Sequence, residues 1–411
     1  MLKKVPILEL RLGMHLHKLE GAWLQHPFWT TRFVIDSSAD LRRLHACGLS
    51  ECWIDTALGL DVAVAAQTIA GPALAARPAP AKVQPPSPAG DRPLNAELTQ
   101  AAAICSRGRK AVKAMFNEAR MGRTVDAEQC LPLVEEIAGS VQRNPGALVS
   151  LARLKTRDDY SYMHSVAVCG LMVALARQSG LDDSRCREAG LAGLMHDIGK
   201  VLMPLEVLNK PGGLTDSEFD IMRTHPQQGH DLLKDGQGVA PSTLDVVLHH
   251  HERIDGSGYP HRLAGDGISL LARMGAICDV YDAVTSDRPY KDGWDPAQSI
   301  ASMASWKGHF DTALFAGFVQ SLGIYPTGSL VRLASGRLAV VAEQNPAKLV
   351  SPVVMVFYSI KSQLPLTPLR LDLARPGTQD RIVAREENSG GRFSQLEALW
   401  ADPEVLRRLR A

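Results

Sequence analysis

The chain has 411 residues, of which 45% are hydrophobic and 22% charged, and its formal net charge is only +1. This length predicts two or three domains, and the composition is typical of a soluble globular protein. The balanced charge excludes a global electrostatic attraction to nucleic acid or to an anionic membrane. The 7 scattered cysteines include no Cys-x-x-Cys pair, which argues against a disulfide framework and favours a reducing, cytoplasmic compartment.

Residues 1–70 are expected to form a small α+β domain with an accessory or regulatory role. Short apolar runs lie at residues 5–10, 33–35 and 52–54, between turn-like and polar stretches. A helical pattern near residues 40–45 adds the α component.

The composition changes over residues 71–97, which are rich in alanine and proline. So many prolines exclude a regular helix or a central strand and predict a semi-extended linker. The N-terminal domain is therefore expected to be tethered to the rest of the chain. No stretch of about 18 uninterrupted apolar residues occurs, so no membrane span is expected.

Helical periodicity follows the linker and predicts a helical domain over residues 98–325. Apolar residues recur at i, i+3, i+4 and i+7 from Val112, which indicates a helix with one buried face. A capping box, Thr215-x-x-Glu218, predicts the start of a helix that carries His225. Further helices are predicted over residues 159–178, 184–196, 242–252 and 270–284, with helix starts at Asp295 and Asp311.

Residues 326–411 show a third pattern and are expected to form a β-rich C-terminal extension. Apolar runs at 330–333, 338–341 and 353–357 lie between glycine and proline breaks, as short strands do. A terminal helix is predicted near residues 394–409. The whole chain is thus predicted to be mainly α, with a small α+β domain before the helical bundle and a β-rich extension after it.

Histidine and aspartate side chains recur along the helical region at intervals of about one helix plus its connection. In a bundle, inward-facing side chains from separate helices can converge on one point. Scattered polar groups on the surface are the alternative interpretation, but three consecutive histidines at the end of an apolar helix would be an unusual structural choice. The candidate donors are His164, His196, Asp197, His225, His250, His251 and Asp279.

A mixed set of imidazoles and carboxylates suits iron, manganese, nickel or zinc better than calcium or magnesium. Two such metals, bridged by a carboxylate and a hydroxide, could generate a nucleophile and hold both oxygens of a phosphodiester displacement. The donors therefore predict metal-dependent hydrolysis of a phosphodiester.

Several stretches resemble the HD-GYP family of HD-superfamily phosphohydrolases, bacterial enzymes that cleave the signalling dinucleotide cyclic di-GMP. The resemblance covers residues 127–322 and implies an HD-type helical bundle. Residues 1–60 also resemble the domain of uncharacterised function that often precedes HD-GYP domains. The matching stretches are His164-Ser165, residues 194–200, Lys210-Pro211-Gly212, His225, residues 250–260 and residues 279–290, and in the N-terminal domain Leu12-Gly13-Met14, Trp23, His26-Pro27-Phe28 and Ile54-Asp55-Thr56.

The resemblance implies that the seven donors bind metal, with Asp197 as the bridging and catalytic carboxylate. Family members with a third metal carry a glutamate four residues before the first histidine, where this chain has Tyr160. Two metals per site are therefore expected, iron or manganese ahead of nickel or zinc. His249 precedes the family's histidine pair and is expected to pack nearby, and Glu252 is expected to orient a neighbouring histidine.

Four residues are expected to contact the substrate. Lys200 is either a solvated lysine at a helix end or, as its place in the motif implies, a catalytic residue that contacts the phosphate or supports the leaving group. Arg288 and Lys291 resemble the family's phosphate-binding pair, although alone they would be ordinary surface residues. Tyr259 could stack on a guanine or close a turn.

The resemblance implies a cyclic di-GMP phosphodiesterase that yields the linear dinucleotide pGpG, GMP or both. Protein partners could bind through the Gly-Tyr-Pro loop or the N-terminal domain. Two alternatives stay open: a cyclic di-GMP sensor with little turnover, and an HD phosphohydrolase of another cyclic dinucleotide or a guanine nucleotide.

Overall fold

A computed structural model describes residues 2–19, 33–35, 41, 44–45, 51–60, 94–154, 160–210, 212–286, 293–388 and 392–410. The chain divides into two compact units, Met1–Pro85 and Pro86–Ala411. The prolines of the predicted linker lie outside the described residues. Among the residues that the structure describes, no helix has both the length and the apolar character needed to cross a membrane.

The first unit contains a four-stranded antiparallel sheet with the strand order β1-β4-β2-β3. Burial alternates along β4, where Cys52 and Ile54 point into the core. The strand β2 was not predicted, because His15, His17 and Lys18 interrupt its apolar residues. Of the predicted helix near residues 40–45, the described residues 41, 44 and 45 are helical and the others lie outside the description. The strands are β1 (Leu2–Pro6), β2 (His15–Leu19), β3 (Phe33–Val34) and β4 (Glu51–Asp55).

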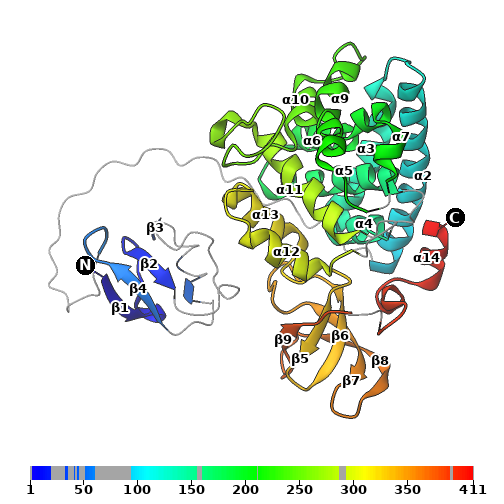
Figure 1. Ribbon diagram of the computed structural model, residues 1–411. Coiled ribbons are helices and arrows are strands. Elements are labelled where there is room, and N and C mark those ends of the chain that lie inside the picture. The colour runs from blue at the N-terminus through cyan, green and yellow to red at the C-terminus, as the bar shows by residue number, and fades with distance from the viewer. Residues whose placement is uncertain are drawn as a thin grey trace. The chain divides into compact units, whose positions relative to one another are not determined.

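The second unit is mainly helical (Figure 1). Its centre is α5 (Tyr160–Gln178), in which every residue from 163 to 176 is buried. A helix buried on all sides must be surrounded by others, and here α2, α3, α4, α6, α11 and α13 pack against it. The other helices are α2 (Leu94–Arg120), α3 (Leu131–Arg143), α4 (Pro145–Ala152), α6 (Asp183–Met195), α7 (Leu205–Leu208), α8 (Asp216–Met222), α9 (His225–Leu233), α10 (Pro241–His249), α11 (Leu270–Thr285), α12 (Pro296–Ser305) and α13 (Thr312–Leu322).

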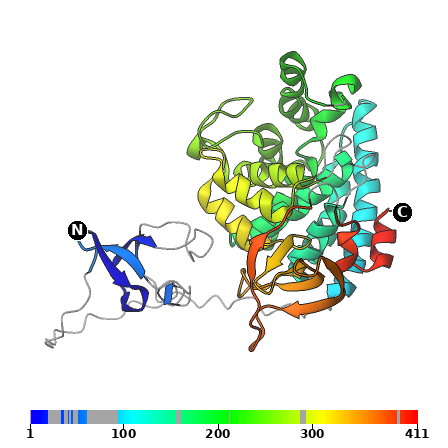
Figure 2. The same cartoon turned by 60° about the horizontal axis from the view of Figure 1, so that its bottom comes forward.

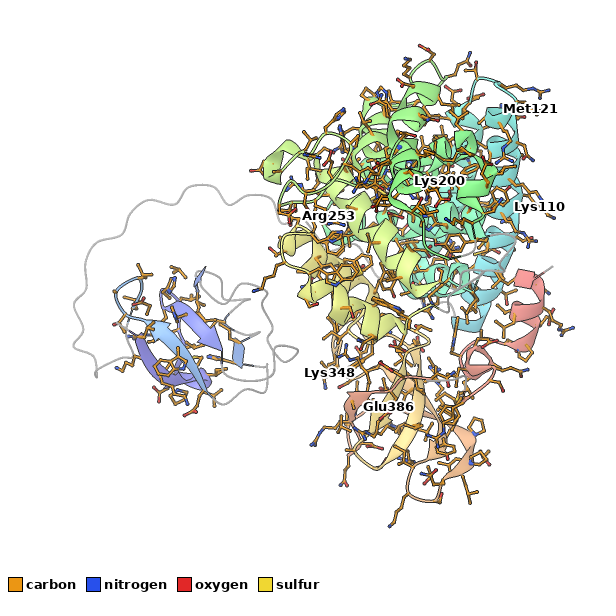
Figure 3. The ribbon with its side chains drawn as sticks, viewed as in Figure 1. Lys110, Met121, Lys200, Arg253, Lys348 and Glu386 are labelled. Carbon is orange, nitrogen blue, oxygen red and sulfur yellow. The ribbon has the colours of Figure 1, made fainter. Side chains whose placement is uncertain are left out.

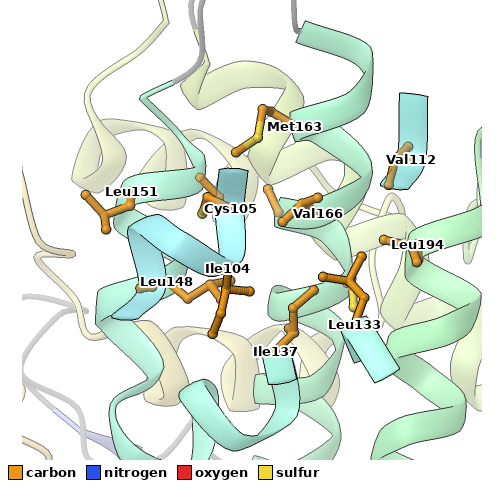
Figure 4. Close-up of a cluster of buried hydrophobic side chains, with 14 of the residues drawn as sticks. Ile104, Cys105, Val112, Leu133, Ile137, Leu148, Leu151, Met163, Val166 and Leu194 are labelled. Carbon is orange, nitrogen blue, oxygen red and sulfur yellow. The ribbon is translucent and has the colours of Figure 1, made fainter. Parts of the chain in front are cut away.

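Apolar side chains of α2, α3, α4 and α6 form a core with those of α5, and Figure 4 shows them pointing toward one another. The helix α2 begins at Leu94, four residues before residue 98, where the helical domain was predicted to start, so residues 94–97 are helix and not linker. Residues named in this view include Ile104, Val112, Leu133, Ile137, Leu148, Met163, Val166 and Leu194, all of which are buried.

One predicted helix is two helices in the structure. The capping box at Thr215 is present, with both reciprocal hydrogen bonds, but the helix that it opens ends at Met222. His225 begins a separate helix, with Pro226 in its first turn. Proline lacks the N–H that a continuing helix needs, and its ring would clash with the carbonyl of Met222, so the chain restarts there.

The C-terminal extension contains a five-stranded antiparallel sheet with the order β8-β7-β6-β5-β9, seen from below in Figure 2. Its strands lie at and beyond the three predicted apolar runs. Leu338, Val340 and Tyr358 of the sheet belong to the same buried cluster as the residues of α2 to α6, so sheet and bundle share one core. The strands are β5 (Leu330–Leu333), β6 (Arg337–Glu343), β7 (Val353–Ser359), β8 (Leu364–Asp372) and β9 (Ile382–Arg385).

The predicted terminal helix is interrupted. A short 3-10 turn, η7 (Leu396–Leu399), is followed by α14 (Pro403–Arg410). Pro403 can only occupy the first turn of a helix, so a single helix through this position was a wrong prediction. Both views show α14 alongside α2 (Figures 1 and 2), and Val405, Leu406 and Leu409 are buried in the shared core.

Candidate metal centre

The structure brings all seven predicted donors together, from five helices and the turns that follow them. They form two groups whose donor atoms lie within 4.8 Å of one another. All are buried except His251, whose side chain is 20% exposed. The first group is His164, His196 and Asp279, and the second is Asp197, His225, His250 and His251.

The Asp197 carboxylate lies between the two groups. Its Oδ1 atom is 3.2 Å from Nε2 of His225 and 3.7 Å from Nε2 of His250. Its Oδ2 atom is 3.4 Å from Nε2 of His164 and also 3.4 Å from Nε2 of His196. One carboxylate thus presents one oxygen to each set of imidazoles, the arrangement that a ligand shared between two cations requires.

Backbone carbonyls fix the orientation of three of the rings. The Nδ1 atoms of His196 and His225 each lie 2.8 Å from a carbonyl oxygen, and that of His250 lies 3.0 Å from another. A carbonyl only accepts, so each Nδ1 carries a proton, which leaves Nε2 as the ring atom available to a metal. The facing Nε2 atoms of His225 and His250 are 3.3 Å apart, and Asp197 Oδ1 has no hydrogen-bond donor. Facing imidazole nitrogens and an unsatisfied buried carboxylate oxygen form an environment that a cation would satisfy.

A carboxylate that sequence reasoning missed orients the fourth histidine. Nδ1 of His164 lies 2.6 Å from Oδ2 of Asp282, which directs Nε2 toward Asp279 at 3.0 Å. Asp279 and Asp282 are one helical turn apart on α11, and this i, i+3 spacing was the available signal. Spacing alone shows that both face the same side, but not which ring they meet.

The buried charges perturb each other strongly. Burial lowers the pKa of His251 to about 3, and it also lowers that of His250 well below its usual value, with the neighbouring histidines adding to the effect. Burial would raise the pKa of Asp197, but Lys200 and His196 outweigh it and hold that pKa well below its usual range. The rings of His250 and His251 are therefore neutral and the carboxylate is ionised, as metal ligation requires.

A close backbone contact holds His225 against the His-Asp segment. Residues after Asp197 form a 3-10 helix, η4 (Ile198–Leu202), which packs on α9. A Cβ at Gly199 would lie 1.9 Å from the His225 carbonyl oxygen and 2.6 Å from the nitrogen of Gly229. Only glycine allows this approach, which explains the glycine in the motif.

The Gly-Tyr-Pro loop folds back onto the histidine pair. A Cβ at Gly258 would lie 2.5 Å from the Glu252 Cα, and the Tyr259 N–H donates to the His251 carbonyl at 3.3 Å. The expectation that Glu252 orients a histidine is wrong. Its buried carboxylate accepts the backbone N–H groups of His261 at 2.7 Å and Leu263 at 3.1 Å, so it holds the loop.

The other residues singled out in the sequence, which are not among the seven donors, lie in different surroundings. Lys200 lies within the helical part of the unit (Figure 3), with its Nζ 2.5 Å from Asp197 Oδ2. Tyr160 stacks parallel to the His164 ring, with centroids 5.8 Å apart. His249 is not one of the clustered donors, and its Nδ1 pairs with Asp245 at 2.8 Å. Arg288 and Lys291 lie outside the described residues.

The helical fold and its histidine and aspartate cluster are those of an HD-domain phosphohydrolase. An HD domain family matches residues 141–314. A domain of unknown function (DUF3391) matches residues 2–130, which extends past the first unit through α2.

The similarity to one relative extends along nearly the whole chain. A cyclic di-GMP phosphodiesterase of Pseudomonas aeruginosa is 52% identical over 405 residues, which cover 97% of this chain and 96% of the relative. This chain therefore belongs to the HD-GYP family of HD-domain phosphodiesterases, with the N-terminal domain of unknown function.

Two other relatives match a shorter part of the chain. A cyclic di-GMP phosphodiesterase response regulator of Xanthomonas campestris is 42% identical over 143 residues, which cover 34% of this chain and 37% of the relative. A 3'3'-cGAMP-specific phosphodiesterase of Vibrio cholerae is 35% identical over 169 residues, which cover 41% of this chain and 32% of the relative.

Proposed function

We propose that this protein hydrolyses cyclic di-GMP to the linear dinucleotide, to GMP or to both. The observation that carries the proposal is the Asp197 carboxylate, whose two oxygens face two separate sets of imidazoles. The Pseudomonas aeruginosa relative, which matches nearly the whole chain, is named for this activity.

In this proposal the donors hold two divalent metals. His164, His196 and Asp279 would bind one, the other three histidines would bind the second, and Asp197 would bind both. Such a pair, when bound, supplies Lewis acidity and an activated water at neutral pH. The clustered donors among the described residues are imidazoles and carboxylates. Such donors suit iron, manganese, nickel or zinc and do not select one of these four metals.

The protein's own contribution is positioning and charge. The carbonyl contacts at Nδ1 hold His196, His225 and His250 so that no reorganisation is needed when the substrate binds. The Lys200 ammonium adds a positive charge at the edge of the cluster, where it would offset charge that develops on the phosphate. We assign Arg288 and Lys291 to the same task on the basis of the motif, and Tyr259 to a substrate contact.

A sensor with little turnover is not favoured, because binding alone would not require a complete set of buried donors. The first unit and the Gly-Tyr-Pro loop are proposed as sites where protein partners bind. Residues 1–70 would act as the regulatory domain and residues 71–93 as its linker. The phosphohydrolase domain would then begin at residue 94, where α2 starts, and extend to residue 325.

The test uses the full chain, reconstituted separately with iron, manganese, nickel and zinc. Cyclic di-GMP binding and product formation are measured in parallel for the wild type and for His196→Ala with Asp197→Ala. The double variant should lose turnover while its circular dichroism stays helical. A matched control, His249→Ala with Asp245→Ala, removes a similar pair outside the cluster and should remain active.

Turnover that persists in the His196 and Asp197 double variant would contradict the mechanism. Binding without product in the wild type, with every metal, would instead support the sensor.

A further inference from the structure

Three side chains form a small stack beside the metal centre, which we call the rim cluster: Phe219, Arg223 and Tyr259. The Tyr259 ring lies over His251, with centroids 4.7 Å apart and planes at 28°. Phe219 of α8 meets Tyr259 edge to face, with centroids 6.5 Å apart. The Arg223 guanidinium carbon lies 4.5 Å from the Phe219 centroid and 5.6 Å from that of Tyr259. A cation and two aromatic rings thus adjoin a metal-donor histidine.

Folding does not explain the rim cluster. The helix α8 buries none of its residues, and Phe219 is 41% exposed beside Ile221, which is 40% exposed. Arg223 has a side chain 49% exposed, and its ion pair with Asp220 is 3.6 Å long, with an Asp220 side chain that is 73% exposed. An ion pair so open to water is weak, so the guanidinium can pair with a ligand. The exposed Phe219 ring and Arg223 cation, next to the half-buried Tyr259 ring, therefore point to binding.

We propose that the rim cluster is the nucleobase subsite of the phosphodiesterase, and that it takes a guanine. This inference rests on the proposed function and assigns Phe219 and Arg223, neither of which the sequence had indicated. Exposed aromatic faces and guanidinium planes are the surfaces on which unpaired bases stack in nucleic-acid-binding proteins. The stack begins at His251, so a base held there belongs to the nucleotide whose phosphate reaches the metal centre.

Arg223 supplies the preference for guanine. Its guanidinium can donate two parallel hydrogen bonds to O6 and N7 of guanine, both of which accept. Adenine presents an amino donor in place of O6, which would face the donors of Arg223 and lose that pairing. The contacts with the two aromatic rings restrict the guanidinium before the base arrives, which reduces the conformational entropy lost on binding.

The experiment compares substrates that differ in their bases. The metal-reconstituted full chain and its Arg223→Ala, Phe219→Ala and Arg223→Lys variants are assayed with cyclic di-GMP, 3'3'-cGAMP, cyclic di-AMP and bis(p-nitrophenyl) phosphate, which has no base. For Arg223→Ala we expect the ratio of kcat/KM for cyclic di-GMP to that for cyclic di-AMP to fall about tenfold or more. Phe219→Ala should lower kcat/KM for all three dinucleotides relative to the base-free diester, mainly through KM.

The control is Arg370→Ala on β8. The Arg370 side chain is 54% exposed, similar to that of Arg223, and it pairs with Glu343 of the C-terminal sheet. Its substrate ratios should equal those of the wild type. Arg223→Lys should restore charge but not the guanine preference, because an ammonium cannot form the paired hydrogen bonds.

Two results would overturn the inference: unchanged ratios in Arg223→Ala and Phe219→Ala, or an equal loss on every substrate including the base-free diester. Failure of the proposed function looks different, since the wild type itself would then form no product from cyclic di-GMP. In that case the equilibrium affinity of the wild type for cyclic di-GMP, compared with that of Arg223→Ala, still decides whether the rim cluster holds a guanine.

Discussion

The Nδ1 atom of His164 lies 2.6 Å from a carboxylate oxygen of Asp282, and both side chains are buried. The three carboxylates around this ring, Asp197, Asp279 and Asp282, outweigh the effect of burial and raise the pKa of His164 to about 10. A carboxylate that holds the far nitrogen of a metal-binding imidazole fixes the orientation of the ring and raises its basicity. We therefore propose Asp282 as a positioning residue for His164, although it is not among the donors.

Replacing Asp282 should weaken metal binding without unfolding the bundle. For Asp282→Ala we expect the metal affinity to fall by about 10- to 100-fold, the effect typical of such outer carboxylates. Competition with a chelator, followed by elemental analysis, measures it. Asp245→Ala removes a carboxylate from His249, outside the cluster, and should leave the affinity unchanged. Equal affinities for the wild type and Asp282→Ala would show that the contact has no positioning role.

Gly199→Ala should separate η4 from α9. The added Cβ would occupy the space of the His225 carbonyl oxygen, and backbone atoms cannot move aside as side chains can. His225 would then shift away from Asp197. We therefore expect fewer metal ions bound per chain, while the circular dichroism spectrum stays helical. Gly213→Ala is the control, because a Cβ there meets no atom within 4 Å. A normal metal content in Gly199→Ala would mean that the contact is not needed for the site.

Leu406→Ala should destabilise the whole second unit rather than only its end. Leu406 is 8% exposed and belongs to the core shared by α14, the sheet and the bundle. Truncating a buried leucine costs about 2–5 kcal/mol. Calorimetry should therefore show one transition at a lower Tm, whereas the exposed neighbour Arg407→Ala should melt as the wild type does. A separate early transition in Leu406→Ala would indicate that the extension unfolds by itself.

The stability of the first turn of α8 should depend on pH, because the carboxylate of Glu218 must be ionised to hold it. Lys210 and the backbone N–H of Thr215 donate to this carboxylate and lower its pKa from 4.5 to about 2. A lowered folded pKa means that the contribution to stability is complete above about pH 4.5 and is lost as the pH falls toward 2. Carbon-13 NMR of labelled glutamate should give a midpoint near 2, which Lys210→Met raises.

Lys234→Met is the matched control for this titration, since Lys234 pairs with Asp231 on α9 instead. A wild-type midpoint near 4.5 would argue that Lys210 and Thr215 do not hold the carboxylate in solution.

The sequence predicted those features that depend on local chemistry. Asp295 and Asp311 begin helices by accepting backbone N–H groups, as expected, and the capping box at Thr215 forms. The seven donors were identified because their residue types and spacing suit a metal site, and the structure brings them together. Their roles as ligands stay a prediction.

Features that depend on partners distant in the chain could not be predicted. An apolar stripe shows that a helix face is buried, but not that β6 and α14 share the core with α2. Arg223 resembled any exposed arginine until its position over two rings was known. Likewise, only the tertiary structure shows that Glu252 binds loop amides rather than a histidine.

The contact between α2 and α14 has a consequence for biosynthesis. A growing chain emerges from the ribosome N-terminus first, so the face of α2 that α14 covers stays exposed to water until residues 403–410 have appeared. Contacts so distant in sequence are also slow to form. The second unit must therefore finish folding after translation of nearly all its residues. During that interval its uncovered apolar surface is the part of the chain that a chaperone would need to protect.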